Sequence, residues 1–158
     1  MWKVKKSKVH GTGIVAICDI KKGTKIIQYL GEKIKKKEGD KRSAARIKKY
    51  LSKKNEGSVY IFELNNKYDI DGSPLYNKAR YINHSCSPNC EVSIIKNEIW
   101  IISIKKIKIG DELNYDYGYP FDKEDYNDHE CRCSSSNCIG YIISKDDWIK
   151  YKKYIKNI

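Results

Sequence analysis

The sequence predicts a mostly β (α+β) fold, in which short strands are joined by irregular segments and by two or three helices. Two observations favour this class. Short runs rich in isoleucine, valine and tyrosine recur along the chain, and glycine, asparagine or aspartate separates many of them, as is typical of strands and their turns. These runs do not alternate regularly with helical patterns, which argues against a doubly wound parallel sheet.

The first part of the chain combines strand signals with one helix signal. Residues 9–16 and 25–31 are expected to form a β-hairpin, because turn residues occupy 19–23 between them. Residues 38–54 predict a surface helix that ends near 55–57, since apolar side chains recur there at helical spacing among many lysines. These apolar positions are Ala44, Ala45, Ile47, Tyr50 and Leu51.

The remaining expected elements are short. They are two strand pairs, a short helix, a single strand and a terminal helix. In chain order they span residues 58–63 with 67–70, 77–81, 91–95 with 98–104, 113–117 and 146–155.

Length and charge restrict the class of protein. The 158 residues suffice for one folded domain, and the mean hydropathy of −0.70 argues against a membrane protein. The N-terminus has no apolar segment, so we expect no secretory signal. The net charge of +12 is uneven, because residues 1–60 hold 18 basic against 5 acidic residues, whereas residues 110–130 carry a net charge of −7.

This charge distribution has two interpretations. The basic half indicates an anionic partner such as nucleic acid, and the acidic segment indicates a basic partner. Lysine accounts for 28 of the 32 basic residues, so a solvated surface of biased composition is the alternative.

Three of the six cysteines stand close together in the pattern Cys-x-Cys-x4-Cys, at Cys131, Cys133 and Cys138. Cysteines one residue apart rarely form a disulfide, and without a secretory signal we expect reduced thiols. Three clustered thiolates suit zinc. A fourth ligand from Cys86 or Cys90 would close a structural site, whereas a vacant position would allow a zinc-bound water. Cys18 is expected to be a small core residue.

Four motifs precede this cluster along the chain. They are His10-Gly11-Thr12-Gly13, Tyr29-Leu30-Gly31-Glu32, Asn83-His84-Ser85-Cys86-Ser87-Pro88-Asn89-Cys90 and Gly110-Asp111-Glu112-Leu113-Asn114-Tyr115-Asp116-Tyr117. With the cysteine cluster they cover about residues 7–142, and this pattern resembles the SET-domain protein lysine methyltransferases of trithorax type. Their short zinc tail is called post-SET.

The resemblance implies a particular organisation. The fold would consist of small curled sheets with a knot-like C-terminal crossing. Residues 1–120 would form the SET domain with the helical insert at about 38–54. Residues 121–142 would form the zinc-bound post-SET tail, and 143–158 a C-terminal basic helix that lies outside the resemblance.

The implied reaction is methyl transfer from S-adenosyl-L-methionine to a lysine amine. By resemblance, Tyr117 is the active-site tyrosine, and Tyr115 limits the number of methyl groups, which favours a mono- or dimethyl product. Tyr29 is a further tyrosine of the catalytic set. The amine must lose its proton before it attacks, because the ordinary pKa of lysine is about 10.4.

The resemblance also implies two sets of ligating residues. The residues expected to contact the cofactor are His10, Gly11, Thr12, Gly13, Tyr60, Arg80, Asn83, His84, Tyr117 and Tyr141. Tyr141 would cover the adenine, and for Arg80 an ion pair that fixes the Asn83–His84 segment is an alternative. Cys86 would be the fourth ligand of one structural Zn²⁺ ion, with Cys90 packed nearby.

The expected substrate is a lysine of a histone tail. The acidic segment 111–130 would attract such a tail, and the basic half with the helix over 41–54 would contact nucleosomal DNA. The expected location is the nucleus and its chromatin, that of a host if the source is a bacterium or virus, with the cytoplasm as the alternative. Two other functions are methylation of a ribosomal or cytosolic protein, and an inactive zinc-stabilised module that binds nucleic acid or a partner.

Overall fold

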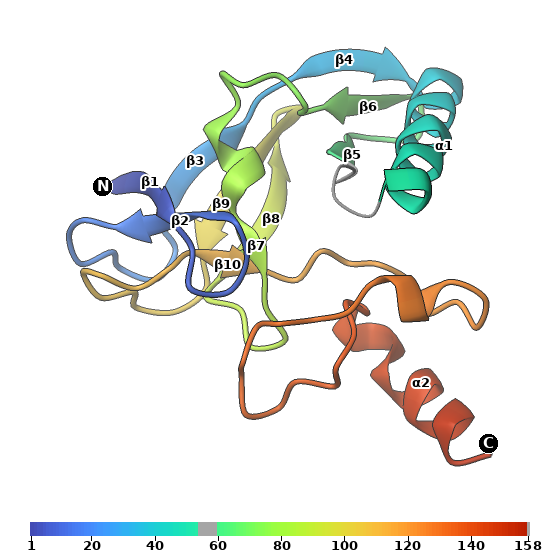
Figure 1. The fold of residues 1–158 in the computed structure, drawn as a ribbon. Helices are drawn as coiled ribbons and strands as arrows, with labels where there is room; N and C mark the ends of the chain where they lie inside the picture. Colours follow the sequence, from blue (N-terminus) through green and yellow to red (C-terminus); the bar gives the residue numbers. More distant parts are fainter. Residues whose placement is uncertain (54–59, 158) are drawn as a thin grey trace. The chain divides into compact units, whose positions relative to one another are not determined.

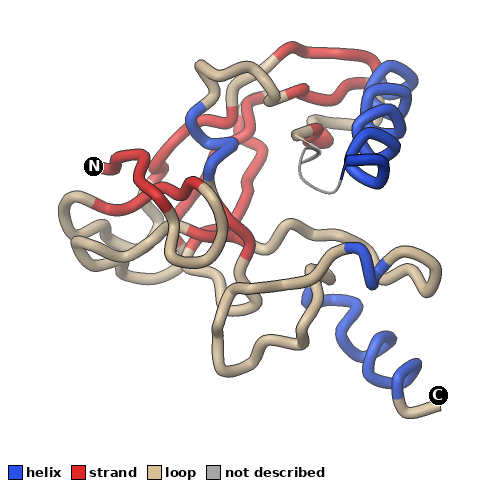
Figure 2. The backbone as a smooth tube through the Cα atoms, viewed as in Figure 1, coloured by secondary structure: helices blue, strands red, loops and turns tan. Residues whose placement is uncertain are grey.

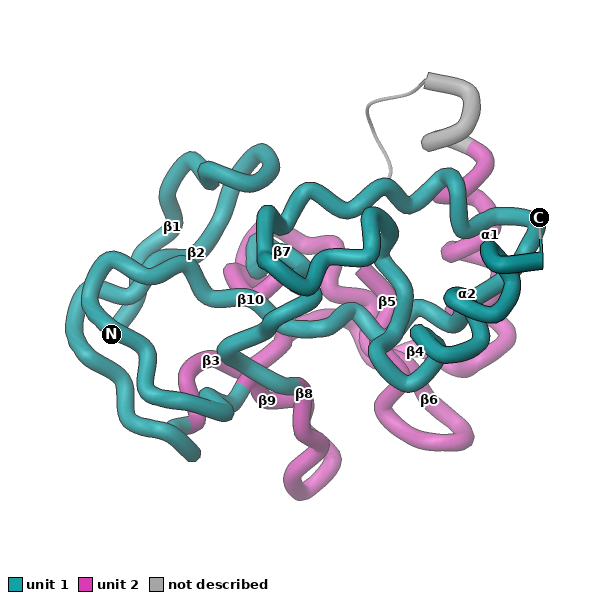
Figure 3. The backbone as a smooth tube through the Cα atoms, turned by 90° about the horizontal axis from the view of Figure 1, so that it is seen from below, with its two compact units in different colours: residues 1–24, 81–91, 102–158 teal, residues 25–80, 92–101 magenta. Residues whose placement is uncertain are grey.

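The computed structural model describes residues 1–53 and 60–157, with the side chains of 49–53 excepted (Figure 1). The chain forms two compact units (Figure 3). Unit 1 comprises residues 1–24, 81–91 and 102–158, and unit 2 comprises residues 25–80 and 92–101.

Unit 1 contains two small two-stranded sheets joined by long irregular segments (Figure 2). Strands β1 (Trp2–Lys6) and β2 (Thr12–Ala16) are antiparallel, with Trp2 opposite Ala16. Strands β7 (Asn83–His84) and β10 (Asn114–Tyr115) are parallel. The unit ends in helix α2 (Trp148–Ile155).

The core of unit 1 comes from residues far apart in the sequence. Its most deeply buried apolar side chains are Ile14, Ile82, Ile107, Leu113 and Ile143. Main-chain bridges between Val15 and Glu112 and between Ile20 and Ile107 hold the N-terminal segment against the segment before β10. The fold of this unit therefore depends on non-local pairing more than on long regular elements.

Unit 2 contains a sheet in the order β4-β6-β5, formed by β4 (Glu32–Lys35), β6 (Tyr68–Asp71) and β5 (Ile61–Glu63). A second sheet has the order β3-β9-β8. Its strands are β3 (Lys25–Tyr29), β9 (Glu98–Ser103) and β8 (Cys90–Ile95), and β8 and β9 each run from one unit into the other along the chain.

Helix α1 (Lys36–Lys53) is fixed to the β4-β6-β5 sheet by buried charge. Asp71 is 2% exposed and accepts hydrogen bonds from Arg42 and Arg46 of the helix at 2.9 Å each. Burial disfavours its carboxylate, but these hydrogen bonds outweigh burial and hold the pKa of Asp71 well below its usual range. The side chain of Asp69 crowds the position where Gly39 would carry a Cβ, so glycine permits the helix to approach.

Most expected elements are confirmed with small shifts. The mostly β class, the helix after β4 and the terminal helix are present, although residues 54–59, where the first helix was expected to end, lie outside the described residues. The hairpin of β8 and β9 turns at Lys96 and Asn97, with φ of 51° and 61°, as in the type I′ turns that match strand twist. The knot-like crossing stays a prediction.

Two local expectations are wrong. The strands near 9–16 and 25–31 do not pair with each other, since β2 pairs with β1 and β3 pairs with β9. The segment between them is tied to distant residues instead, because Gly23 N donates to Ser103 O at 2.7 Å. Cys18 is exposed rather than a core residue, as it lies beyond the end of β2.

Candidate active site and metal centre

The pair β7–β10 brings two of the sequence motifs together (Figure 1). Asn83 lies opposite Asn114, and His84 lies opposite Tyr115. The pair continues through a hydrogen bond from Ser85 N to Tyr115 O at 3.1 Å. The Asn-His motif and the tyrosine motif therefore lie side by side in the fold, although they are separate in the sequence.

Tyr117 follows β10, which ends at Tyr115 and is shorter than the strand expected over 113–117. Its hydroxyl donates to the carbonyl oxygen of Ile82 at 3.1 Å. Its ring centroid is 5.1 Å from that of Tyr115 and 5.4 Å from that of His84. With its proton directed to Ile82, the hydroxyl oxygen can accept a hydrogen bond from a ligand.

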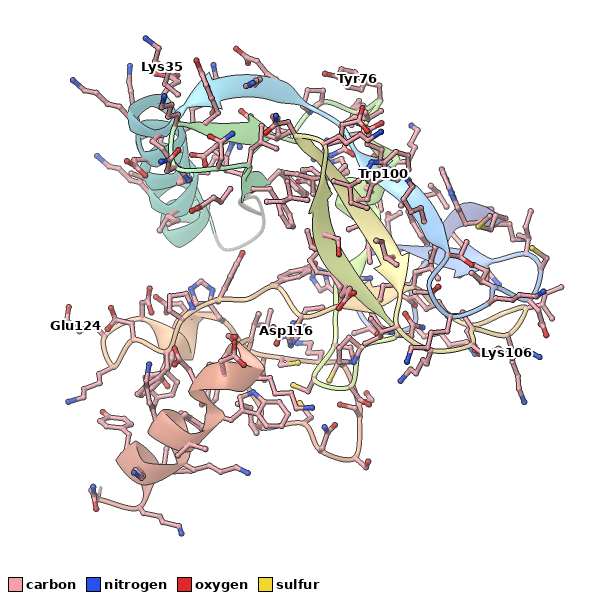
Figure 4. The ribbon with its side chains drawn as sticks, turned by 180° about the vertical axis from the view of Figure 1, so that it is seen from behind. Lys35, Tyr76, Trp100, Lys106, Asp116 and Glu124 are labelled. Carbon is pink, nitrogen blue, oxygen red and sulfur yellow. The ribbon has the colours of Figure 1, made fainter. Side chains whose placement is uncertain are left out.

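The buried imidazole of His84 connects this tyrosine to the cysteine cluster. Its Nδ1 accepts a hydrogen bond from the backbone N–H of Tyr117 at 3.2 Å, so the proton of the neutral ring is assigned to Nε2. Nε2 lies 3.7 Å from Cys86 Sγ. Burial lowers the pKa of His84, although the Asp116 carboxylate, 3.8 Å from Nδ1, opposes this effect (Figure 4).

The turn between β1 and β2 is held by a carboxylate. Glu112 Oε1 accepts hydrogen bonds from Ser7 Oγ at 2.7 Å and from Asn83 Nδ2 at 2.8 Å. Asn83 Nδ2 also reaches the carbonyl oxygens of Thr12 at 3.2 Å and His10 at 3.3 Å. This hub of Ser7, Asn83 and Glu112 fixes the turn relative to β7.

Two glycines in the same turn are required for different reasons. Gly11 has φ of +52°, a left-handed conformation that glycine adopts without strain. A Cβ on Gly13 would lie 2.5 Å from Glu112 Oε1, so glycine here makes room for the carboxylate. The side chains of His10 and Thr12 are exposed. The predicted cofactor turn is thus an exposed loop with a rigid base.

Glu112 was not singled out by the sequence analysis, although it lies within the motif over 110–117. In the sequence it is one of eight acidic residues between 110 and 130. Its importance arises because the fold places it against Ser7 and Asn83, which are 105 and 29 positions away.

Four thiols form the candidate metal centre. The Sγ atoms of Cys86, Cys131, Cys133 and Cys138 all lie within 4.8 Å of one another, and Cys86 Sγ is 3.8 Å from those of Cys131 and Cys138. Zinc–sulfur bonds of about 2.3 Å in a tetrahedron imply sulfur–sulfur distances of about 3.8 Å. The donor set therefore fits a closed structural zinc site, and Cys90 is outside it.

The thiols differ strongly in acidity. Burial raises the pKa of Cys86 to about 12 and also raises the pKa of Cys131. For Cys133, hydrogen bonds from the Ser135 hydroxyl and from backbone N–H groups outweigh burial and lower the pKa to about 6. Negative charge therefore concentrates first on Cys133, which suits the binding of a cation.

The loop that carries three of these cysteines is closed at its base by a short main-chain ladder. Glu130 and Tyr141 form an antiparallel bridge, and Cys131 N donates to Gly140 O at 2.9 Å. Tyr141, the residue expected to cover an adenine, thus lies at the base of the thiol loop. Its ring packs 4.9 Å from that of Tyr126.

Three predicted site residues belong to unit 2, whereas all others belong to unit 1. The hydroxyl of the buried Tyr29 donates to Tyr60 O at 2.9 Å, and its ring occupies the space that a side chain on Gly72 would need. The Arg80 guanidinium lies 4.1 Å from the centroid of the Tyr60 ring, and it donates to the carbonyl oxygen of Ser73. Tyr29, Tyr60 and Arg80 therefore form one connected group.

A protein-family model matches most of this chain. The family model described as the SET domain matches residues 11–118. This match includes three of the four sequence motifs in full and begins within the first. No helix within the described residues is long and apolar enough to span a membrane.

Three similar proteins have names that agree with this family. Histone-lysine N-methyltransferase 2D of Homo sapiens is 36% identical over 137 residues, which cover 84% of this chain and 2% of that protein. Histone-lysine N-methyltransferase trithorax of Drosophila melanogaster is 34% identical over 141 residues, covering 87% of this chain and 4% of the relative. Histone-lysine N-methyltransferase, H3 lysine-4 specific, of Saccharomyces cerevisiae is 35% identical over 141 residues, covering 87% and 13%. The chain thus spans a small part of each relative.

Proposed function

The chain belongs to the SET-domain family, and we propose that it transfers methyl groups from S-adenosyl-L-methionine to lysine side chains of histone tails. The observation that carries this proposal is the parallel β7–β10 pair, which joins the Asn83-His84 motif to Tyr115 and the neighbouring Tyr117. The names of the relatives support the reaction and the class of substrate.

The cofactor site of this proposal is built mainly from unit 1. The exposed turn over 10–13 offers backbone groups, and the Asn83 side chain that fixes this turn has its Oδ1 directed to no partner among the described residues. That oxygen suits the ammonium group of an amino-acid ligand. His84 contributes backbone groups beside the adenine, and Tyr141 supplies an aromatic ring to cover it. Tyr60 and Arg80, which pack against each other in unit 2, stay predictions from the sequence.

When bound, the cofactor supplies an activated methylsulfonium, so the chain's own residues need only align a neutral amine and exclude water. Tyr117 accepts a hydrogen bond at its hydroxyl oxygen while its own proton is held by Ile82 O. Tyr115 packs against it at 5.1 Å and narrows the space beside the amine, which favours a mono- or dimethyl product. Tyr29 is a further catalytic tyrosine in this proposal.

One structural Zn²⁺ ion is held by Cys86, Cys131, Cys133 and Cys138 in this proposal. With four thiolates the ion has no open position for water, so it stabilises the tail and takes no part in the chemistry. The sulfur–sulfur distances of 3.8 Å support zinc as the occupant.

The substrate is proposed to be histone H3, with lysine-4 as the target, because the yeast relative is named as specific for that lysine. Exposed acidic side chains between 110 and 130, among them Asp122, Glu124 and Asp125, support attraction of a basic tail (Figure 4). We propose that the protein acts in the nucleus, on chromatin, with the cytoplasm as the alternative.

Contact with nucleosomal DNA is proposed for α1, through exposed lysines such as Lys37, Lys41 and Lys48. The arginines Arg42 and Arg46 are bound to Asp71 and so contribute less to phosphate binding than the sequence suggested. Activity on nucleosomes should then fall more steeply with salt than activity on a free peptide. Equal salt dependence on the two substrates would refute the DNA contact.

The substrate proposal is tested with amino-terminal peptides of histone H3 that carry either lysine or alanine at position 4. Mass spectrometry should show added methyl masses on the first peptide and none on the second. Methylation of both peptides would assign a different lysine. Methylation of neither, together with methylation of ribosomal or cytosolic proteins, would favour a non-histone substrate.

A further inference from the structure

Helix α2 ends the chain in a cluster of aromatic side chains within unit 1. Its one buried residue is Tyr151, which is 7% exposed. The rings of this cluster belong to Phe121, Tyr126, Tyr141, Tyr151 and Tyr154. The helix therefore packs against both the segment that follows the tyrosine motif and the base of the thiol loop.

Tyr151 packs against three of the other four rings of this cluster. Its ring centroid lies 5.5 Å from that of Tyr126, 5.6 Å from that of Phe121 and 5.9 Å from that of Tyr141. Burial, together with Tyr141 and Tyr126, raises the pKa of Tyr151, so the ring packs as a neutral phenol. Two rings thus pack against the ring of Tyr141, namely that of Tyr126 and that of Tyr151 from the helix.

The start of α2 is anchored to the segment that leaves Tyr117. Phe121 N donates to Asp147 Oδ2 at 3.0 Å, and Lys145 N donates to Asp116 Oδ2 at 2.9 Å (Figure 4). The Trp148 indole donates to Ile143 O at 3.1 Å. These bonds fix where the helix begins, so the position of Tyr151 is set by the fold.

We propose that α2 braces Tyr141, so that Tyr151 is a positioning residue for the adenine of the cofactor. This inference rests on the proposed function, in which Tyr141 covers the adenine. An aromatic ring that is already ordered binds a purine more tightly than one that must be ordered on binding, because the apparent dissociation constant rises as the competent fraction falls. The brace acts on cofactor affinity and leaves binding of the lysine peptide unchanged.

The test measures binding of S-adenosylhomocysteine to the full chain by calorimetry, beside zinc content and the KM for a histone peptide. Tyr151→Ala should raise the dissociation constant about tenfold, as expected when a tenth of the molecules keep Tyr141 in place. Tyr151→Phe, which retains the ring, should bind as the wild type. Ile149→Ala, at a position of the same helix that is 68% exposed, is the matched control and should also bind normally.

Two outcomes are incompatible with this inference. Unchanged affinity in Tyr151→Ala would overturn the inference, and so would a loss of zinc in parallel with affinity, because the helix would then support the thiol loop. If Tyr151→Ala does not fold, Tyr151→Leu, which keeps an apolar side chain of substantial size, replaces it with the same expected result. A wild-type chain that binds no S-adenosylhomocysteine would refute the proposed function itself.

Discussion

Replacement of Glu112 by glutamine tests whether the hub of Ser7, Asn83 and Glu112 prepares the cofactor turn. The Glu112 carboxylate accepts from Ser7 Oγ at 2.7 Å and from Asn83 Nδ2 at 2.8 Å, both at the same oxygen. Glutamine keeps the shape of the side chain but removes its charge. One of its two terminal positions becomes an NH₂ group, which cannot accept a hydrogen bond.

The size of the effect follows from these two bonds. A hydrogen bond to a charged group contributes about 1.5–3 kcal/mol, and a neutral one about 1 kcal/mol. Loss of charge assistance on two bonds therefore costs about 1–3 kcal/mol, and the half-buried position of Glu112 favours the lower part of that range. About 1.4 kcal/mol corresponds to a tenfold decrease in the affinity for the cofactor.

Calorimetric binding of S-adenosylhomocysteine measures this effect in Glu112→Gln. The dissociation constant should rise about tenfold, while zinc content and the far-ultraviolet circular dichroism spectrum stay as in the wild type. Glu91→Gln, an exposed carboxylate on β8, is the matched control. Wild-type affinity in Glu112→Gln would refute the role of the hub, and a loss of folded structure would assign Glu112 to stability instead.

Three further predictions concern stability, the metal and the product. Asp71→Asn should lower the free energy of unfolding by about 3 kcal/mol at pH 7, because it breaks a buried ion pair. The pKa of Asp71 in the folded state lies below the unfolded value of about 3.9, so this difference between wild type and variant should shrink in denaturant titrations as the pH falls below 4. A constant difference down to pH 2 would contradict the pairing. Cys131→Ser should reduce bound zinc below one ion per chain in elemental analysis, whereas Cys90→Ser should retain it, because Cys90 is buried outside the thiol cluster. Tyr115→Phe should increase the share of more highly methylated peptide in mass spectra, and an unchanged product distribution would show that Tyr115 does not limit the product.

The sequence predicts those parts of the fold whose signals are local. The hairpin turn at Lys96 and Asn97 depends on residues within the turn, and the helix after β4 has apolar residues at helical spacing, so both patterns are visible in the local sequence. The contacts of that helix with Asp71 are visible only in the fold. The pairing of β1 with β2 was missed because Val4 lies on an exposed strand among lysines. The pairing of β3 with β9 was also not predicted, because strands that are far apart in the sequence pair without a recognisable local pattern.

The candidate site divides in the same way. Asn83, His84 and the thiol cluster were predicted from motifs in which several characteristic residue types stand close together. The structure places Cys86 beside the other three thiols. Glu112 and Tyr151 were not predicted, because the local sequence does not set either residue apart from its neighbours. Only the folded chain gives them partners, and those partners lie in segments that the sequence pattern does not connect.

We propose that this chain methylates lysine through the site around Tyr117. The most direct measurement is intact-mass spectrometry of histones and nucleosomes after incubation with S-adenosyl-L-methionine, with the wild type beside Tyr117→Phe. Histone masses should increase by whole methyl units with the wild type, and most of this increase should be lost in the variant, which retains affinity for S-adenosylhomocysteine. Equal methylation by the two proteins would contradict the role of Tyr117, and no methylation by a wild type that binds no cofactor would contradict the enzymatic function.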